Sequence, residues 1–304
     1  MRYKFHTADV FTDRVFGGNP LAVFPDGQGL STEQMQAVAR EFNLSETVFV
    51  LPPAQPVHTR RLRIFTPTAE LPFAGHPTVG TAHVLAATGD ILLAGDETGI
   101  VFEEGVGPVP VKIRAAAGAP VFAQLSVAQL PEFGTEIPAP NDIARALSLQ
   151  LDDLLLGEDH PQAVSCGVPF LYVALRDKAA VGRARMAADV WDRVRTENTP
   201  PWIYLFSYET ERPDSQVHAR MFAPASGIGE DPATGAAAAA LAGYLAAIDR
   251  SRDGTLHWVV EQGFGMGRPS IIEVEADKAD GAVTAVRVGG AAVLVSEGTM
   301  DIPS

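Results

Sequence analysis

Two short motifs could each hold an anionic group at the start of a helix. The first begins with His76 and has the sequence His-Pro-Thr-Val-Gly, and the second begins with Asp231 and has the sequence Asp-Pro-Ala-Thr-Gly. Proline is favoured in the first turn of a helix, where unpaired N–H groups bind anions. Gly75 and Gly235 would let a ligand approach the backbone closely. Either motif alone is equally explained by a capped core helix, but the pair favours a small substrate with a carboxylate or a developing enolate charge.

Glu46 is a candidate for proton transfer. It lies in the segment Asn-Leu-Ser-Glu-Thr, between a predicted helix that ends near Phe42 and a predicted strand over residues 48–51. A carboxyl group in a tight junction with apolar flanks loses hydration, which raises its pKa and lets it act as both acid and base. Taken alone, however, the segment is more simply explained by a solvated loop carboxylate.

The chain repeats itself around these candidates. Residues 63–67 and 220–224 both have the pattern Arg-apolar-Phe-x-Pro, and each is followed by one of the two motifs. Further upstream, residues 18–24 resemble residues 167–173, since both have Gly-x-Pro before an apolar run. Chance similarity in an Ala-, Gly- and Pro-rich chain is the alternative, but two matches in the same order favour a duplicated domain. A pseudo-two-fold relation would bring the two motifs to opposite sides of one cleft.

The elements that must position these residues are short strands around two central helices. Ser31 and Gln34 form a capping box that starts a helix, which Asn43 ends. His76 and Asp231 are expected as the caps of the two central helices, with the following prolines as the first helical residues. The pattern predicts an α+β protein rather than a βαβ array. Strands are predicted at residues 21–24, 48–51, 61–65, 109–114, 258–262, 271–275, 283–288 and 292–297.

The domain change is expected between residues 118 and 140. We therefore predict an N-terminal domain of residues 1–118 plus about 289–304, and a C-terminal domain of residues 119–288, with the active site in the cleft between them. The length of 304 residues agrees with two domains.

Composition and charge exclude several classes of protein. A content of 46% apolar and 20% charged residues indicates a globular rather than a disordered chain. With 23 Lys and Arg against 37 Asp and Glu, the net charge of −14 argues against binding to nucleic acid or to an anionic membrane. The start of the chain lacks the apolar core of a signal peptide, and the most apolar stretch, residues 236–248, is shorter than the ~20 residues of a membrane span. A cytoplasmic location is expected.

Together these segments resemble the phenazine-biosynthesis PhzF-like isomerase family. The similarity is colinear from Phe5 to near the C-terminus, and five segments carry it: residues 17–23, 43–47, 73–80, 230–235 and 267–270. The resemblance implies the diaminopimelate-epimerase fold, in which two similar domains related by a pseudo-two-fold each wrap a curved, barrel-like, mostly antiparallel sheet around a central helix. It also implies cofactor-free isomerase chemistry and, commonly, a homodimer.

The resemblance further implies roles for individual residues. Glu46 would shuttle the proton, and His76 and Asp231 would flank the reacting centre. The residues implied to line the substrate site are Asn19, Ser45, Gly75, Thr234, Gly235 and Ala236. The family often has Ser where this chain has Ala236, and the loss of that hydroxyl leaves the substrate open. The best-known reaction of the family isomerises trans-2,3-dihydro-3-hydroxyanthranilate, so we expect similar chemistry on a small carboxylated metabolite.

Two other functions remain as alternatives: an epimerase of an amino-acid-like substrate, and a non-catalytic member of the family that binds a small ligand. Epimerases of this fold that use two thiols would have them near Ala74 and Pro232, and neither residue can carry a proton. The single Cys166 is better explained as a buried structural residue. The seven His residues lack metal-ligand spacing, and the glycine-rich residues 263–267 favour a turn rather than a phosphate loop. We expect neither a metal nor a cofactor.

Overall fold

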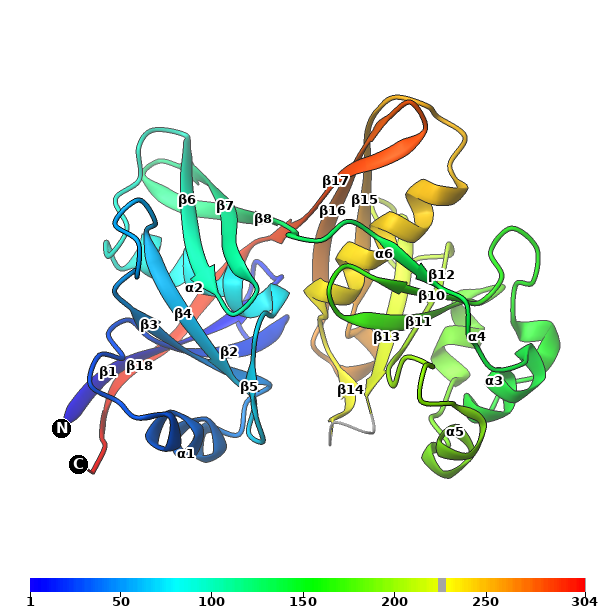
Figure 1. The fold of residues 1–304 in the computed structure, drawn as a ribbon, viewed down its shortest axis with the longest axis horizontal. Coiled ribbons are helices and arrows are strands. Elements are labelled where there is room, and N and C mark those ends of the chain that lie inside the picture. The colour runs from blue at the N-terminus through cyan, green and yellow to red at the C-terminus, as the bar shows by residue number, and fades with distance from the viewer. Residues whose placement is uncertain (224–227, 304) are drawn as a thin grey trace. The chain divides into compact units, whose positions relative to one another are not determined.

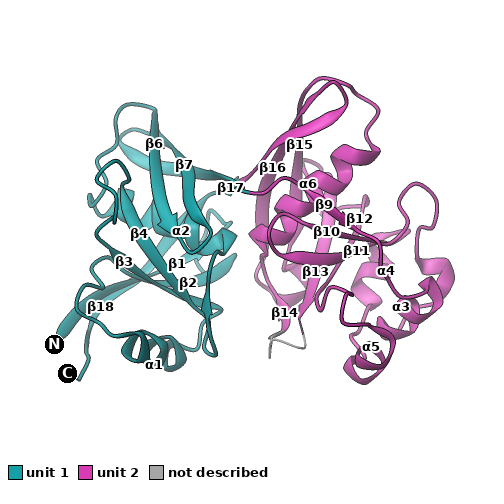
Figure 2. Cartoon of the chain, in the orientation of Figure 1, with its two compact units in different colours: residues 1–128, 289–304 teal, residues 129–288 magenta. Residues whose placement is uncertain are grey.

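Strand β1 (Arg2–Val10) lies between two strands that are far apart in the sequence. It pairs antiparallel with β2 (Asn19–Phe24) on one side and with β18 (Ala292–Asp301) on the other (Figure 1). The structure is a computed structural model that describes residues 1–223 and 228–303. The chain divides into two compact units (Figure 2). The first has residues 1–128 and 289–304, because β18 returns to pair with β1, and the second has residues 129–288.

The first unit is a curved, mostly antiparallel sheet with two helices. The pairs β2–β3 and β4–β6 are parallel, and the other strand neighbours are antiparallel. Strand β8 belongs to this unit, so the unit extends beyond residue 118. Its remaining elements are α1 (Thr32–Phe42), β3 (Glu46–Leu51), β4 (Arg60–Phe65), β5 (Glu70–Leu71), α2 (Gly75–Ala87), β6 (Glu97–Glu104), β7 (Gly107–Ala116) and β8 (Ala119–Ser126).

The second unit has the same kinds of elements, with the three short α-helices α3, α4 and α5 beside its central helix, which confirms the predicted α+β class. The short helices lie between β9 and β12, in the green part of Figure 1. The elements are β9 (Glu132–Gly134), α3 (Pro140–Ala146), β10 (Gln162–Ser165), β11 (Pro169–Ala174), α4 (Lys178–Arg183), α5 (Ala188–Val194), β12 (Ile203–Ser207), β13 (Val217–Ala223), β14 (Ile228–Asp231), α6 (Gly235–Ile248), β15 (Gly254–Gln262), β16 (Ser270–Ala279) and β17 (Ala282–Gly290).

The two units share one order of strand pairing. In the first unit β2–β3 is parallel, β3–β4 antiparallel and β4–β6 parallel, and α2 lies between β5 and β6. In the second unit β11–β12 is parallel, β12–β13 antiparallel and β13–β15 parallel, and α6 lies between β14 and β15. Each unit therefore contains one copy of the repeat that the sequence indicates.

The repeat extends to side-chain pairs. The Arg63 guanidinium donates to both Glu70 carboxylate oxygens at 2.7 and 2.6 Å, and Arg220 donates to both oxygens of Glu230 at 2.7 and 2.8 Å. Each Arg also lies over the ring of the Phe two residues later, at 5.1 and 4.7 Å. Two-point binding of a planar guanidinium to a carboxylate fixes orientation as well as distance. These pairs give β4–β5 and β13–β14 the same geometry.

The register of the repeat differs from the sequence alignment at the helix starts. Helix α2 begins at Gly75 and α6 at Gly235, so the counterpart of Pro232 is Pro72 rather than Pro77. The N-caps are Ala74 and Thr234, and the expected caps at His76 and Asp231 are wrong.

The physical reasons for these shifted starts lie in the prolines. Pro77 fits inside the first turn of α2 because the first N–H groups of a helix have no helical partner. Asp231 stays extended at the end of β14 because a residue before proline disfavours the helical region.

Helices α2 and α6 form the cores of their units. Every residue from Gly75 to Ala86 is buried, and α6 is buried over nearly its whole length. A helix that is apolar on all sides needs burial on all sides, and strands of its own unit contact each one. Helix α1 instead has one buried face, and its predicted capping box between Ser31 and Gln34 and its left-handed end at Asn43 are confirmed. None of the described helices is long and apolar enough to cross a membrane.

Gly18 allows a close approach of backbone segments directly before β2. Its φ is +58°, and a Cβ at this position would lie 2.2 Å from the Val10 carbonyl oxygen. We expect Gly18→Ala to lower the free energy of unfolding by ~3 kcal/mol or more, since the left-handed conformation costs ~1–2 kcal/mol and overpacking ~1–3 kcal/mol. Urea denaturation measures this change.

Gly89 is the matched control for this prediction. Its φ is +82°, but within the described part of the chain a Cβ there would meet no atom within 4 Å. Gly89→Ala should therefore lose only the conformational part, ~1–2 kcal/mol. Equal losses in the two variants would contradict the close approach at Gly18.

Candidate active site

Glu46 and His76 meet in the first unit. Glu46 is the first residue of β3 and lies opposite Leu21 of the parallel strand β2, while His76 is the second residue of α2. Glu46 Oε2 is 3.2 Å from His76 Nε2, and the side chains are 12% and 5% exposed. The two atoms approach without the alignment of a hydrogen bond. Catalytic pairs often gain that alignment only when the substrate binds.

His76 is a neutral imidazole. Burial lowers its pKa to about 3, and a ring N–H that donates to the Pro20 carbonyl offsets this only in part. Its Nδ1 lies 3.4 Å from Nδ2 of the fully buried Asn19, the first residue of β2. Because an uncharged ring does not stabilise an anion by Coulomb attraction, His76 does not lock Glu46 in its ionised form. Their contact is therefore one between a carboxyl group and a neutral imidazole.

Two further predicted site residues of the first unit, Ser45 and Gly75, are next to Glu46 and His76 in the sequence. Ser45 is half-buried and precedes β3 directly, and Gly75 is the buried first residue of α2. The first N–H groups of α2, including that of Gly75, lack partners inside the helix. The first unit thus presents a carboxyl group, a neutral imidazole and a helix start within one stretch of structure.

Glu104 is a buried acid beside the start of α2 that the sequence analysis missed. It is the last residue of β6 and only 8% exposed. Its Oε1 lies 2.6 Å from the hydroxyl of Thr78, in the first turn of α2, and burial raises its pKa to about 8. The alternation of residues along the strand could have identified it, because Glu104 points to the same face as the buried Ile100 and Phe102.

In the second unit, Asp231 belongs to a hydrogen-bonded network at the start of α6. Its carboxylate accepts a hydrogen bond from the Thr234 hydroxyl, and its main-chain oxygen accepts one from Gln262 Nε2 at 2.8 Å. Gln262 Nε2 also donates to the Thr234 hydroxyl at 3.1 Å, and Gln262 Oε1 accepts from the Tyr204 hydroxyl at 3.0 Å. Gln262 and Tyr204 are fully buried. Gln262 was predicted only as a strand residue and Tyr204 not at all, so neither was expected at the site.

Gly235 and Ala236 are the first two residues of α6. Gly235 is buried, whereas Ala236 is half-exposed, so a side chain at position 236 can reach solvent or a ligand. Thr234 makes no side-chain bond to the N–H groups of the helix, which leaves those groups available. The second helix start therefore combines donors with the buried carboxylate of Asp231.

Thiol and metal chemistry have little support in the described residues. Cys166 is buried, and this burial raises its pKa to about 12, so its thiol is a poor base and a poor nucleophile. In residues 1–223 and 228–303, no three His, Cys, Asp or Glu side chains form a group that could hold a metal ion.

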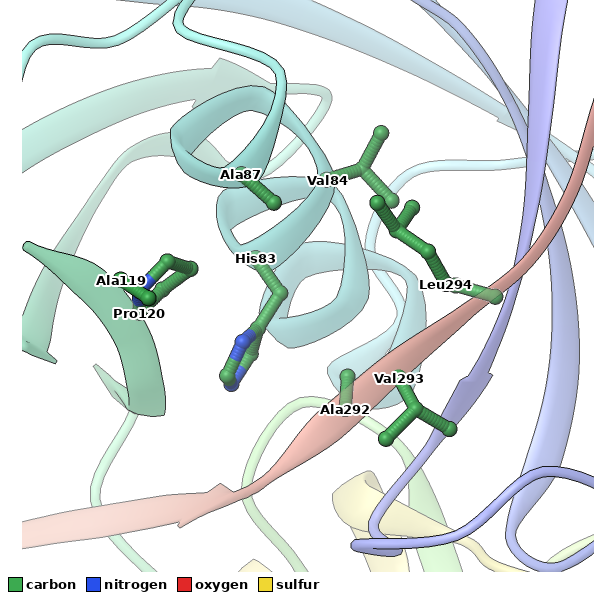
Figure 3. Close-up of a pocket in the computed structure, with 9 residues that line it drawn as sticks. His83, Val84, Ala87, Ala119, Pro120, Ala292, Val293 and Leu294 are labelled. Atoms are coloured by element: carbon green, nitrogen blue, oxygen red, sulfur yellow. The ribbon is translucent and has the colours of Figure 1, made fainter.

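A second histidine of α2 lines a separate cavity of about 220 Å³ in the first unit (Figure 3). His83 Nε2 donates to the Gly290 carbonyl at 3.1 Å, and burial lowers its pKa to about 4. The other walls are apolar and come from β1, from the first residues of β8 and β18 and from the last turns of α2. His83 is two turns away from His76 along α2, so this cavity is distinct from the Glu46–His76 pair.

Comparison with known proteins shows the family to which the chain belongs. The family model described as phenazine biosynthesis-like protein (PhzC-PhzF) matches residues 8–298. An uncharacterized isomerase of Mesorhizobium japonicum is 43% identical, with 97% of each chain covered. The trans-2,3-dihydro-3-hydroxyanthranilate isomerase of Pseudomonas aeruginosa is 35% identical, with 97% of this chain and 98% of the relative covered.

Solved structures show the same fold. The phenazine biosynthesis protein of the PhzF family from Bacillus anthracis has a TM-score of 0.89 at 26% identity, covering 99% of this chain and 100% of that one. A hydroxyproline epimerase from Agrobacterium vitis has a TM-score of 0.66 at 14% identity, covering 98% and 92%, and shares the fold alone. The protein has the diaminopimelate-epimerase type of α+β fold, belongs to the phenazine biosynthesis-like (PhzC-PhzF) family and is an isomerase.

Proposed function

We propose that the protein moves a proton within a small carboxylated metabolite without a cofactor, and that Glu46 is the acid and base. The observation that carries this proposal is the buried contact between Glu46 and a neutral His76. A general acid–base must populate both protonation states, and a carboxyl group beside an uncharged partner can do so. A cationic partner would instead hold it ionised.

The proposed reaction has two proton transfers through one carboxyl group. Glu46 removes a proton from a carbon that is α or vinylogous to a carboxylate or enol, and then returns it at another carbon of the same face. His76 donates or accepts a hydrogen bond at the substrate, which orients the reacting atoms. N–H groups at the helix starts stabilise the negative charge that develops between the two transfers.

The substrate class is proposed from the same features. A carboxylate suits the N–H groups at Gly75 and Gly235, and Asn19 and Thr234 add polar groups that fix its orientation. The relative from Pseudomonas aeruginosa is named for trans-2,3-dihydro-3-hydroxyanthranilate, which makes this compound the first substrate to test. Ala236 lacks the hydroxyl that the family often has at this position, so a less polar substrate at this point is part of the proposal.

Epimerisation is the second candidate, because Asp231 is another buried carboxyl group at a helix start. Incubation in deuterium oxide separates the candidates. An isomerase forms a product with hydrogen at a new carbon, which is deuterium to the extent that the Glu46 carboxyl group exchanges with solvent between the two transfers, whereas an epimerase incorporates deuterium at one stereocentre with inversion. A ligand-binding protein would leave every carbon-bound proton in place, and this outcome would contradict both catalytic candidates.

A cytoplasmic homodimer is also proposed. Val121, Leu294 and Val295 expose 47%, 43% and 38% of their surface on strands β8 and β18 of the first unit. Exposed apolar side chains on neighbouring segments are typical of a contact between subunits. Sedimentation velocity at micromolar concentration tests this, and a single monomeric species would contradict it.

Glu46→Gln should keep the fold but lose ~10²–10⁴-fold in turnover, the range that general acid–base groups usually contribute. The amide retains the size and the hydrogen bonding of the side chain but cannot accept the substrate proton. Conversion of trans-2,3-dihydro-3-hydroxyanthranilate to its isomer measures the rate.

The exposed Glu41 of α1 provides the matched control for this variant. Glu41→Gln should change the rate by less than two-fold or so, since the residue lies on the solvent side of α1. A Glu46→Gln enzyme within a few-fold of the parent would show that another group moves the proton.

Two substitutions of Asp231 separate its contribution to stability from its contribution to turnover. Asp231→Asn keeps an oxygen that accepts from the Thr234 hydroxyl, so its melting temperature should stay close to that of the parent. Asp231→Ala leaves this hydroxyl without its acceptor and should cost ~1–3 kcal/mol. Both variants should lose ~10²-fold in turnover, because both remove the charged partner of the substrate.

Calorimetry and the deuterium assay together test the Asp231 prediction. The expectation that His76 and Asp231 serve one substrate from two sides of a cleft stays a prediction of the sequence. Full activity of Asp231→Asn would rule out a catalytic part for this residue.

A further inference from the structure

We propose that Glu104 is a positioning residue for the reaction, and that in its protonated form it holds the start of α2 so that the Gly75 N–H points outward. This inference rests on the proposed function. It assigns a role to a buried acid that the proton transfer itself does not use.

The count of hydrogen atoms around Thr78 carries the inference. Thr78 Oγ1 lies 2.8 Å from the Ala74 carbonyl oxygen and 2.6 Å from Glu104 Oε1. A hydroxyl group has one proton, and a carbonyl oxygen can only accept. When Thr78 donates to Ala74, the proton in the contact with Glu104 must come from Glu104. An ionised Glu104 would accept the hydrogen bond of the Thr78 hydroxyl, and Thr78 would then no longer donate to the Ala74 carbonyl.

The surroundings of Glu104 favour the protonated form. Within the described part of the chain, Glu104 Oε2 is buried without a hydrogen-bond partner, which is costly for an ionised oxygen. Burial is the main cause of its raised pKa, and only the Thr78 hydrogen bond opposes it. No charged group contributes to this shift among the titratable residues of α2, β4, β6 and β7, which are His76, His83, Arg60, Arg61, Arg63, Glu97, Glu103, Lys112 and Arg114.

The second unit provides an independent observation. Gln262 is the last residue of β15, as Glu104 is the last residue of β6, and these strands are counterparts in the repeat. Each is followed by a glycine whose Cβ would lie within 3 Å of the proline three residues before the central helix. Gln262 also hydrogen-bonds to a threonine at the helix start, Thr234. The counterpart of Glu104 is thus an amide, which has the shape of a protonated carboxyl group and never ionises.

The geometry of one peptide unit connects Glu104 to the site. The Ala74 carbonyl accepts from the Thr78 N–H at 3.3 Å and from the Thr78 hydroxyl at 2.8 Å, so the shorter bond comes from the side chain. The carbonyl of Ala74 and the N–H of Gly75 belong to the same planar trans peptide and point in opposite directions. A carbonyl held toward the helix therefore directs the Gly75 N–H away from it, beside His76, where the proposed substrate anion binds.

The protonation state can be tested without a substrate. A carboxyl group whose folded pKa of about 8 exceeds its unfolded value stabilises the fold fully below the unfolded pKa, and this contribution is lost as the pH rises through 8. Glu104→Gln keeps a donor for Thr78 and cannot ionise. Between pH 5 and 8, the unfolding equilibrium constant of the parent should rise at least ~10-fold relative to Glu104→Gln, because each unit of pKa difference is tenfold.

Glu103 is the matched control for the stability measurement. Its carboxylate accepts from the backbone N–H groups of Ala54 and Gln55 and from His58, and these bonds lower its pKa to about 2. Glu103→Gln should therefore alter the pH dependence only on the acid side, below about pH 5. Parallel profiles for the parent and Glu104→Gln from pH 5 to 9 would show that Glu104 is ionised and overturn the proposal. Infrared difference spectra of the parent at pH 6 and 9 give the same answer if the variant does not fold.

The positioning role needs a second measurement, the pH profile of kcat/KM with trans-2,3-dihydro-3-hydroxyanthranilate. Thr78→Val removes the hydroxyl at nearly constant volume and should lower kcat/KM ~10-fold or more through loss of orientation. The kcat/KM of Glu104→Leu should fall by the same factor, whereas that of Glu104→Gln should stay within a few-fold of the parent value and should persist above pH 8. Parental kcat/KM in Thr78→Val would overturn the positioning role. An inactive parent with the expected stability profiles would contradict the proposed function but not the protonated Glu104.

Discussion

Exclusion of water from the first turn of α2 determines the chemistry of the first unit. The helix is buried on all sides, so its titratable neighbours keep their neutral forms: His76 is an uncharged imidazole, and Glu104 has a raised pKa. Glu46 consequently faces a neutral partner in a mostly buried contact. A solvated helix start would return both pKa values toward those of free side chains, about 6.5 for His76 and about 4.3 for Glu104, so that Glu104 would be ionised at neutral pH.

The duplicated scaffold carries different side chains in its two copies. The Arg–Glu pairs, the pairing order of the strands and the helix-preceding prolines recur in both units. Because Gly75 corresponds to Gly235, the counterpart of His76 is Ala236, and the counterpart of Asp231 is Leu71. The repeat thus supplies two similar helix starts, while the acid–base candidates lie at positions that are not equivalent. Symmetry of the backbone coexists with asymmetry of the chemistry.

Sequence reasoning predicted the fold class and the repeat, and the family resemblance singled out Glu46 and His76, which lie 3.2 Å apart. The register of the repeat and the supporting residues were not predicted. The Arg-x-Phe pattern identified the repeat because it reflects a fixed packing of Arg on Phe in both units. The two proline motifs misled the alignment, since Pro77 lies inside the first turn of α2, whereas Pro232 lies three residues before α6. Glu104 escaped notice because a polar residue before glycine resembles a turn, and Gln262 because nothing distinguishes it from the other residues of its predicted strand. Only the tertiary structure shows that each is buried beside a threonine.

The pairing of β1 with β18 has a consequence for how the chain folds during synthesis. Ribosomes release β1 first, and β18, which begins at Ala292, emerges only after the whole second unit. Residues 129–288 are contiguous and can fold as they are synthesised. In the first unit, by contrast, β1 is an open sheet edge until its partner β18 has been synthesised. An open edge is prone to pairing with other chains. The nascent first unit therefore stays open to pairing with other chains for longer than the second unit.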